Sequence, residues 1–283
     1  MTVAPPEPRI TRHPDAAAFL AATQAFRAQE PVLTNILGSV AAGVVAGRRY
    51  ERELWLTVDR PDIVGVAMRT APWNLSVSPM DEDAARALGR FVAIEDPDLP
   101  GITGPRSVVD AVLEGLAPSR TPRTIIIEVA RVLADFRPPD PVDGSARRAA
   151  VADRDLVMTW HREFGEDVGL PLHELEGAVD MAIANGSLWL WIVDGNPTAM
   201  AGHALPVAVP SGMVTRVGPV FTAPSVRGRG YGTAITAHVT ARLRDSGATV
   251  MLFADAANAR TNAIYQRLGF DPYAEFVEVA LED

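Results

Sequence analysis

Apolar residues at helical spacing open the second half of the chain. Leu156, Trp160 and Phe164 follow one another at intervals of four, and Asp153 precedes them as a candidate N-cap. This pattern predicts a helix over residues 153–167. Because strand patterns follow these helical ones, the half as a whole favours a mixed α/β fold.

Farther along, short strands alternate with helices. Residues 188–193 alternate aliphatic and tryptophan side chains, and a turn at residues 194–196 predicts a hairpin with the next strand. Gly247 and Gly269 are expected to end two later helices. The elements expected here are a helix over 172–184, strands over 188–193, 198–209 and 213–221, a helix over 230–245, a strand over 249–254, a helix over 260–268 and a strand over 273–281.

A proline-rich segment divides the chain. Residues 136–148 combine three prolines, a glycine and polar residues between two apolar-rich regions, which is typical of an interdomain linker. We place the boundary at Val142. The expected domains are therefore residues 1–142 and residues 143–283.

Two neighbouring segments of the first half resemble two segments of the second. Residues 53–59 and 65–72 have the pattern of residues 188–194 and 200–206. Repetition of this kind predicts a duplicated fold, and the alternative is a coincidence between strand patterns.

The composition excludes several kinds of chemistry. The 283 residues include no cysteine, which rules out disulfides, thiolate metal sites and a thiol nucleophile. They include no lysine, which rules out a Walker-type phosphate loop. No His/Asp/Glu cluster has metal-ligand spacing. The net charge of −9 opposes binding to nucleic acid.

No segment has the pattern of a membrane anchor. The longest apolar stretch, residues 32–46, is interrupted by polar residues and glycines and is shorter than the roughly 20 residues that span a bilayer. Residues 1–12 are proline-rich and lack the pattern of a signal peptide. We therefore expect a cytoplasmic protein without membrane contact.

The strongest chemical signal is a glycine-rich turn between a strand and a helix. Gly228, Gly230 and Gly232 allow positive φ and carry no Cβ, so successive backbone N–H groups can converge on a phosphate. The helix that starts there adds the positive end of its dipole, and Arg227 and Arg229 add charge. A dinucleotide fingerprint is the alternative, but its closing position is not a glycine. The turn therefore predicts a diphosphate site, and the other alternative is an ordinary strand-to-helix turn with solvated arginines.

This turn and a second motif resemble one family. Residues 227–232 fit R-x-x-G-x-G, the coenzyme A loop of the GNAT N-acetyltransferase superfamily. Asn258, residues 262–265 and residues 268–270 resemble that family's N-x-x-x-N-A-x-x-x-Y-x-x-x-G-F signature, with the tyrosine two positions earlier. The resemblance covers residues 147–283. It implies an α/β fold with a mixed sheet, the GNAT acyl-CoA N-acyltransferase fold, and two tandem GNAT-like domains.

The resemblance implies acetyl-coenzyme A as the acyl donor. In the family, the strand before the loop leaves its neighbour through a bulge, and the freed N–H groups bind the thioester carbonyl and the pantetheine arm. For the two asparagines of the second motif, helix capping is the alternative to cofactor binding. The residues expected to bind the cofactor are Val220, Phe221, Thr222, Arg227, Gly228, Arg229, Gly230, Tyr231, Gly232, Thr233, Asn258 and Asn262.

Tyr265 matches the family's catalytic tyrosine and is expected to protonate the departing thiolate, with core packing as the alternative. The general base stays open, because residues 213–217 contain no carboxylate where many relatives place one. Trp189 and Trp191 are expected in the core rather than in an acceptor pocket. The candidates for the base are Glu163, Glu166, Glu174, Asp255, His203 and a water relay.

The expected function is transfer of an acetyl group from acetyl-coenzyme A to a primary amine of a small molecule or peptide, by direct attack in a ternary complex. The alternative is a non-catalytic GNAT-fold module that binds a ligand or a partner. The first half lacks both motifs, and residues 100–105 are its closest counterpart to the loop. We expect that half to be a degenerate domain that shapes the acceptor site. A homodimer is compatible with this interpretation.

Overall fold

The computed structural model describes residues 6–117, 119–168, 175–210 and 212–282. The first half begins with a strand and three helices, three strands follow, and helices and strands then alternate. Its elements are β1 Arg9–His13, α1 Ala16–Ala22, α2 Gln24–Gln29, α3 Asn35–Val45, β2 Glu53–Asp59, β3 Ile63–Thr70, β4 Leu75–Val77, α4 Glu82–Glu95, β5 Gly101–Pro105, α5 Arg106–Leu116 and β6 Thr121–Leu133.

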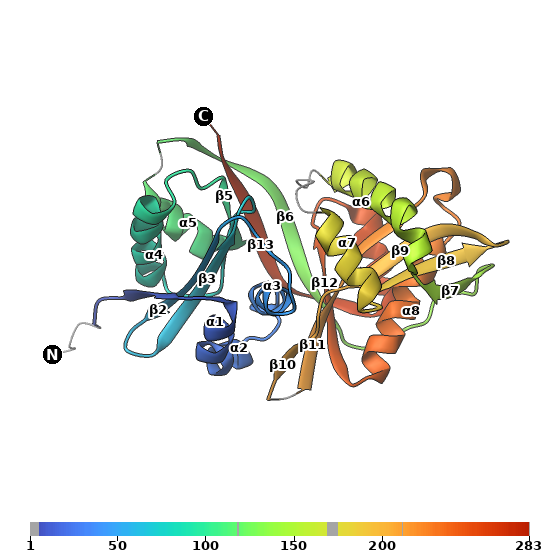
Figure 1. Ribbon diagram of the computed structural model, residues 1–283, viewed down its shortest axis with the longest axis horizontal. Helices are drawn as coiled ribbons and strands as arrows, with labels where there is room; N and C mark the ends of the chain where they lie inside the picture. The colour runs from blue at the N-terminus through green and yellow to red at the C-terminus, as the bar shows by residue number, and fades with distance from the viewer. Residues whose placement is uncertain (1–5, 118, 169–174, 211, 283) are drawn as a thin grey trace.

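The second half follows nearly the same order, with a short additional strand after its hairpin (Figure 1). Its elements are β7 Ser145–Arg148, the 3-10 turn Val151–Asp153, α6 Arg154–Val168, α7 Leu175–Ala184, β8 Leu188–Val193, β9 Asn196–His203, β10 Val207–Val209, β11 Gly212–Thr222, the 3-10 turn Pro224–Val226, α8 Tyr231–Asp245, β12 Ala248–Asp255, α9 Ala259–Leu268 and β13 Phe270–Glu282. In both halves a hairpin precedes a parallel strand pair that is connected by a helix.

Glycines set several of these boundaries, as expected from the sequence. Asp194 and Gly195 both adopt positive φ, 48° and 77°, in the tight turn between β8 and β9. Gly247, with φ of 83°, follows α8, and Gly269, with φ of 96°, ends α9. A residue without Cβ takes this left-handed conformation at little cost, so the chain can reverse at these points.

A 13-stranded sheet runs through the described parts of both halves (Figure 1). Its strand order is β1-β2-β3-β4-β5-β13-β6-β12-β11-β9-β8-β7, and β10 pairs with β11. The final strands of the halves are exchanged, because β13 pairs with β5 of the first half and β6 pairs with β12 of the second. These two strands also pair with each other, from Phe270 opposite Leu133 to Glu282 opposite Thr121. Backbone hydrogen bonds therefore join the halves.

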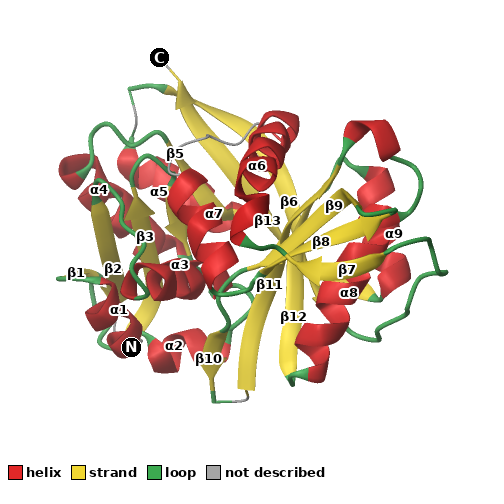
Figure 2. Cartoon of the chain, turned by 45° about the vertical axis from the view of Figure 1, so that its right-hand side comes forward, coloured by secondary structure: helices red, strands yellow, loops and turns green. Residues whose placement is uncertain are grey.

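Helices cover both faces of the sheet in each half (Figure 2). On β8, Leu190 packs with α6 and α7, and Trp189 packs on the opposite face with α8 and α9. On β2, Leu54 packs with α4 and α5, and Trp55 with α1 and α3. Val277 of the exchanged strand β13 belongs to the first half's core. Each half therefore completes its core with a strand from the other.

Two local expectations differ from the structure. Asp153 does not cap α6, because its carboxylate accepts hydrogen bonds from the Ala150 N–H at 2.8 Å and from the Arg147 guanidinium at 2.6 and 2.8 Å. The strand expected over residues 198–209 is divided into β9 and β10. Pro206 lies in the break, where a residue without an N–H group cannot continue the ladder.

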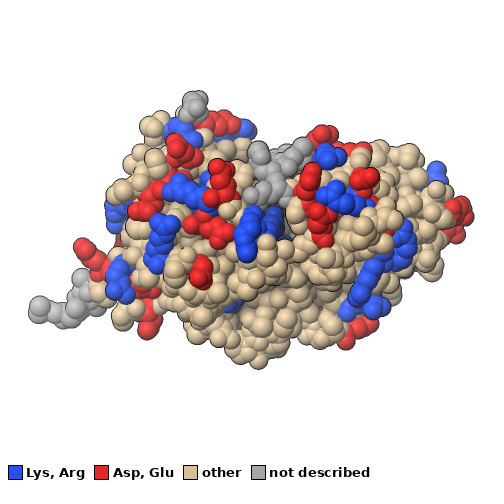
Figure 3. Space-filling view, in the orientation of Figure 1, with Lys and Arg blue, Asp and Glu red and all other residues tan. Residues whose placement is uncertain are grey.

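The surface shows no single charged region on the face drawn in Figure 3, where acidic and basic side chains are interspersed. The net charge of −9 is therefore not gathered into one acidic patch on that face. Among the described residues, none of the helices is long and apolar enough to cross a membrane.

Candidate active site

Strands β11 and β12 separate at the point where the glycine-rich turn begins. They pair in parallel only as far as Arg216 opposite Met251. Beyond that point β11 pairs with β9 on its other edge, with a shift of register between Val217 and Val220. Gly218 lies inside this shift with φ of 149°. A gap therefore opens between the last residues of β11 and β12.

Backbone N–H groups of β11 point into this gap. The Ala223 N–H donates to the Thr198 carbonyl in β9 at 3.0 Å. Since successive residues of a strand direct their backbone groups to opposite edges, Phe221 also faces β9. The N–H groups of Val220 and Thr222 consequently face the gap. Of the three residues predicted to supply main-chain donors, two have this orientation.

The turn after β11 presents further unpaired amides. Gly228 and Gly230 both have φ of 87°, and Gly230 is the N-cap of α8. The first helical hydrogen bond runs from the Ala234 N–H to the Gly230 carbonyl, and no side chain caps the helix. The N–H groups that precede Ala234 in the first turn of α8 make no hydrogen bond within the helix. They can bind an anion, which the helix dipole also favours. These residues are Tyr231, Gly232 and Thr233.

Gly232 serves a different purpose from the other two glycines. The expectation of positive φ is wrong for this residue, which lies in the first turn of α8. A Cβ built on Gly232 would lie 2.6 Å from Oγ1 of Thr222. Glycine is therefore needed because the helix passes close to the end of β11, which keeps the free amides of both elements together.

Arg227 folds back over the end of β11. Its Nε donates to the Thr222 carbonyl at 3.0 Å, and its Nη2 lies 2.7 Å from the carboxylate of Asp167 in α6. The guanidinium also lies 5.4 Å from the centre of the Phe221 ring. Both members of the ion pair are partly exposed. An anion at the start of α8 would compete with Asp167 for this guanidinium.

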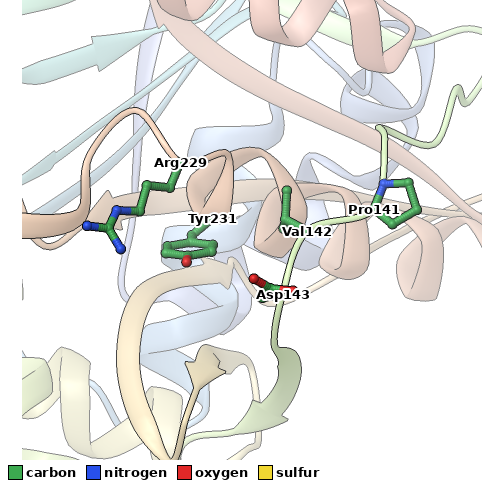
Figure 4. A pocket seen from close by; sticks show the side chains of 5 residues that line it. All are labelled: Pro141, Val142, Asp143, Arg229 and Tyr231. Carbon is green, nitrogen blue, oxygen red and sulfur yellow. The ribbon is translucent and has the colours of Figure 1, made fainter.

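Two further arginines lie beside the turn. Arg229 and Tyr231 line a hollow of about 520 Å³ together with the linker residues 141–143, and the Arg229 side chain extends away from the linker (Figure 4). Nη2 of Arg260, in the first turn of α9, lies 4.0 Å from the position of a Cβ on Gly228. Sequence analysis missed Arg260, although it stands inside the asparagine and tyrosine motif.

Tyr265 lies in the core between α8, α9 and the sheet, at 9% exposure. Its ring contacts Phe270 edge-on at 6.1 Å. Within the described part of the chain its hydroxyl makes no hydrogen bond. Burial raises the pKa of Tyr265 to about 12, so the hydroxyl keeps its proton at neutral pH. The group has the protonation state that a proton donor requires.

The two asparagines make hydrogen bonds inside the protein. Asn258 caps α9, because its Oδ1 accepts from the Thr261 N–H at 3.0 Å. Asn262 donates to the carbonyls of Asp255 and Asn258, at 2.8 and 2.9 Å, and accepts from Nε of Arg131 at 3.1 Å. The capping alternative therefore holds for Asn258. Contact of either asparagine with a cofactor stays a prediction.

The candidate bases named from the sequence are dispersed. Glu163 is half-buried and Glu166 is exposed, both on α6, while Glu174 lies outside the described residues. Asp255 ends β12 and accepts from the Ala257 N–H at 2.8 Å. His203 lies on β9, where burial lowers its pKa.

The tryptophans of β8 face away from the helices α6 and α7. Trp189 is 9% exposed and contacts His238 at 4.8 Å between ring centres. The guanidinium groups of Arg148 and Arg242 lie 5.2 and 5.3 Å from its ring centre. Trp191 packs on the same face, as expected for core residues.

One half-buried carboxylate near the gap was not predicted from the sequence. Glu128 of β6 lies directly opposite Asp255, at the end of β12, and directly opposite Phe276 of β13. Burial and the charge of Glu278 raise the pKa of Glu128 to about 7; Arg216 opposes this rise and Asp255 adds to it. The available signal was a single carboxylate in an apolar run, residues 125–130.

The corresponding place in the first half is closed to an anion. The helix between the parallel strands β4 and β5 is α4, so its start corresponds to the start of α8. The expected counterpart at residues 100–105 is therefore wrong, because these residues lead into α5. Asp81 caps α4 through the Ala84 N–H at 2.9 Å, and Glu82 and Asp83 follow in its first turn. Carboxylates at this position oppose a diphosphate.

The architecture matches solved structures of one superfamily. A GCN5-related N-acetyltransferase from Sphaerobacter thermophilus superposes with a TM-score of 0.62 at 16% identity, covering 99% of this chain and 97% of that one. Another from Kribbella flavida gives 0.60 at 19% identity, covering 90% and 96%. The chain has the fold of the GNAT N-acetyltransferases, as the two motifs predicted.

Sequence comparison gives a narrower likeness. Residues 190–279 match the model of the FR47-like protein family. A mycothiol acetyltransferase of Rhodococcus erythropolis is 32% identical over 126 residues, which are 42% of this chain and 41% of that protein. The match thus spans less than half the length of that relative.

Proposed function

We propose that this protein is an N-acetyltransferase that transfers the acetyl group of acetyl-coenzyme A directly to a primary amine. The observation that carries the proposal is the continuity between the gap beside β11 and the free amides at the start of α8. Together they form a continuous row of unpaired N–H donors that runs from the end of β11 to the first turn of α8. Such a line suits a ligand with a diphosphate at one end and a thioester carbonyl at the other.

Each part of the site has a role in this proposal. The amides of Tyr231, Gly232 and Thr233 bind the diphosphate, with the arginines of the turn supplying positive charge. The N–H groups of Val220 and Thr222 bind the pantetheine arm and the thioester carbonyl, where they stabilise the oxyanion that forms on attack. The acceptor nitrogen forms a bond to the carbonyl carbon, and the carbon–sulfur bond then breaks.

Tyr265 supplies the proton for the departing sulfur. Its hydroxyl is protonated at neutral pH, and no protein group within the described residues competes for that proton. Because a thiolate is already a fair leaving group, the tyrosine accelerates the collapse without being indispensable to it.

We infer that residues 1–142 form a degenerate GNAT-like domain and residues 143–283 the catalytic one. The repeated element order supports two tandem units, and the acidic start of α4 supports the loss of cofactor binding in the first. Exchange of β6 and β13 places first-half residues beside the gap. The first half would therefore shape the acceptor site.

The acceptor is proposed to be a small molecule with a primary amine. The mycothiol acetyltransferase relatives make the unacetylated precursor of mycothiol the first amine to test. Spermidine, glucosamine and a dipeptide with a free N-terminus complete the panel, with thiol release as the readout. Saturable binding of acetyl-coenzyme A without transfer to any of these amines would favour the ligand-binding module instead.

Calorimetric titration with acetyl-coenzyme A tests the cofactor site. Replacement of Arg227 by alanine is expected to weaken binding of acetyl-coenzyme A about tenfold. This is the contribution of one charged hydrogen bond to the diphosphate, reduced because Arg227 must first leave its ion pair with Asp167. Asp167→Asn should strengthen binding, because it frees the Arg227 guanidinium. Arg267→Ala is the matched control, since Arg267 is exposed at the end of α9 and outside the turn. Equal affinities in all four proteins would refute the assigned diphosphate site.

A further inference from the structure

The strand exchange brings a carboxylate from the first half to the edge of the gap. Asp255 is the last residue of β12, the strand that forms one side of the gap, and Glu128 of β6 lies directly across from it. Directly opposed residues of an antiparallel pair project from the same face of the sheet. Glu128 and Asp255 therefore share a face.

On this face, residues of β6 and β12 pack against Val32 and Leu33, which precede α3. Side chains alternate along a strand, so Phe253 and Met251 of β12 project from the same face as Asp255. Arg216 of β11 is the parallel partner of Met251 and therefore belongs to this face as well. Tyr265 packs on the other face, beneath α8 and α9. Tyr265 and Glu128 therefore lie on opposite sides of the sheet.

Glu128 differs from the other carboxylates at this place because it has no hydrogen-bond partner within the described residues. Asp255 accepts from the Ala257 N–H at 2.8 Å, and Glu278 accepts from Nδ2 of Asn74 at 2.9 Å. No three acidic or histidine side chains in the described ranges are arranged to hold a metal ion. The Glu128 carboxylate is therefore available for proton transfer.

The strand that carries an acid in many GNAT relatives has Arg216 on this face instead. Arg216 is half-buried, and its Nη1 donates to Oδ1 of Asn35 in α3 at 3.1 Å. Burial lowers the pKa of Arg216 to about 10, so it stays cationic near neutral pH. A positive group cannot accept a proton, so Arg216 does not serve as the base.

We propose that Glu128 is the general base of the reaction, supplied to the second half's site by the exchanged strand of the first. This inference rests on the proposed function. Its carboxylate accepts the proton that the acceptor nitrogen loses as the new carbon–nitrogen bond forms. The carbon–sulfur bond breaks, and the sulfur takes the hydroxyl proton of Tyr265. Solvent then restores the tyrosine proton and removes the proton from Glu128.

The charge environment suits a base that works near neutral pH. Burial and Glu278 of β13 raise the pKa of Glu128 to about 7, Arg216 of β11 lowers it, and Asp255 of β12 raises it further. A catalytic group is most effective when its pKa lies close to the working pH. The carboxylate form, which accepts the proton, predominates above pH 7.

The test compares pH profiles of kcat/KM for wild type, Glu128→Gln and Glu278→Gln, with whichever panel amine the wild type acetylates. Glu128→Gln is expected to lower kcat/KM at pH 8 by about 100-fold or more. It should also abolish the acidic limb near pH 7, while acetyl-coenzyme A affinity stays within about twofold. Glu278→Gln should keep the activity at pH 8 and move the limb to lower pH, because one source of repulsion is gone.

Methoxyamine, whose nitrogen is neutral at pH 7, provides a second readout. With this acceptor the acidic limb near pH 7 should remain in the wild type, because the substrate does not titrate there, and it should disappear in Glu128→Gln, because the nitrogen must still lose a proton as the bond forms. A structural defect would lower the activity at every pH and leave the limb in place. A wild type that binds acetyl-coenzyme A and acetylates an amine, with limbs unchanged in both variants, would overturn the role of Glu128 alone. A wild type without binding or transfer would overturn the proposed function as well. If Glu128→Gln does not fold, the pH profile of Glu278→Gln provides the test. An acidic limb at the same pH as in the wild type would then overturn the role of Glu128.

Discussion

Replacement of Glu128 by glutamine is expected to stabilise the protein, and to do so in a pH-dependent manner. In the folded protein the pKa of this carboxyl is raised from its ordinary value of 4.5 to about 7, mainly by burial. The unfolded chain therefore loses the proton first as the pH rises. Folding stability falls between these two values, because the folded state must either hold the proton or bury a charge.

The size of this effect follows from the two pKa values. One pKa unit corresponds to about 1.4 kcal/mol, so the full difference destabilises the wild type by about 3 kcal/mol above pH 7. At pH 5 less than about 1 kcal/mol of this loss is present, because pH 5 lies only slightly above the pKa of the Glu128 carboxyl in the unfolded chain. Glutamine carries no ionisable proton. The free energy of unfolding of Glu128→Gln should therefore exceed that of the wild type by about 2 kcal/mol more at pH 8 than at pH 5.

Urea unfolding at pH 5 and pH 8, followed by tryptophan fluorescence, measures this difference. All other titrating groups are common to both proteins, so their contributions cancel in the comparison. Glu166→Gln is the matched control, because Glu166 is exposed on α6 and should change stability by less than about 0.5 kcal/mol at either pH. A stability difference of the same size at both pH values would refute the raised pKa assigned to Glu128.

Three further predictions concern the cofactor turn and α9. Gly232→Ala should destabilise the fold by about 1 to 3 kcal/mol through contact with Thr222 and weaken acetyl-coenzyme A binding, as thermal unfolding and calorimetry would show. The additional change Thr222→Ala should restore stability. A single variant as stable as the wild type would contradict the close approach of the two residues. Tyr265→Phe should leave stability nearly unchanged and reduce kcat about 100-fold. Unchanged turnover at every pH would remove the tyrosine from its role. Asn262→Ala should lower the free energy of unfolding by about 1 to 3 kcal/mol, because it removes the acceptor of Nε of the buried Arg131 and the donor to the carbonyls of Asp255 and Asn258. An unaltered urea midpoint would show that these hydrogen bonds contribute nothing.

Much of the second half could be predicted because its signals are local. Hydrophobic periodicity and the glycines after α8 and α9 depend only on neighbouring residues, and they located these helices to within a residue or two. The strand-to-helix turn at residues 227–233 was equally accessible, since glycine's freedom and the dipole of the following helix need no tertiary context. The same reasoning overstated Gly232, whose requirement is the proximity of Thr222 rather than its own backbone angle.

The environment of the proposed base depends on residues far apart in the chain. Glu128 acquires its neighbours from β11, β12 and β13, which follow it by roughly 90 to 150 residues, and only strand register decides which side chains meet. The exchange of β6 and β13 is not visible in the sequence of either strand, because the alternation of side chains along a strand does not depend on which strand it pairs with. Periodicity therefore identified the elements and the turn. Pairing between distant strands decided which carboxylate lies beside the gap, because burial and neighbouring charge arise only when those strands meet.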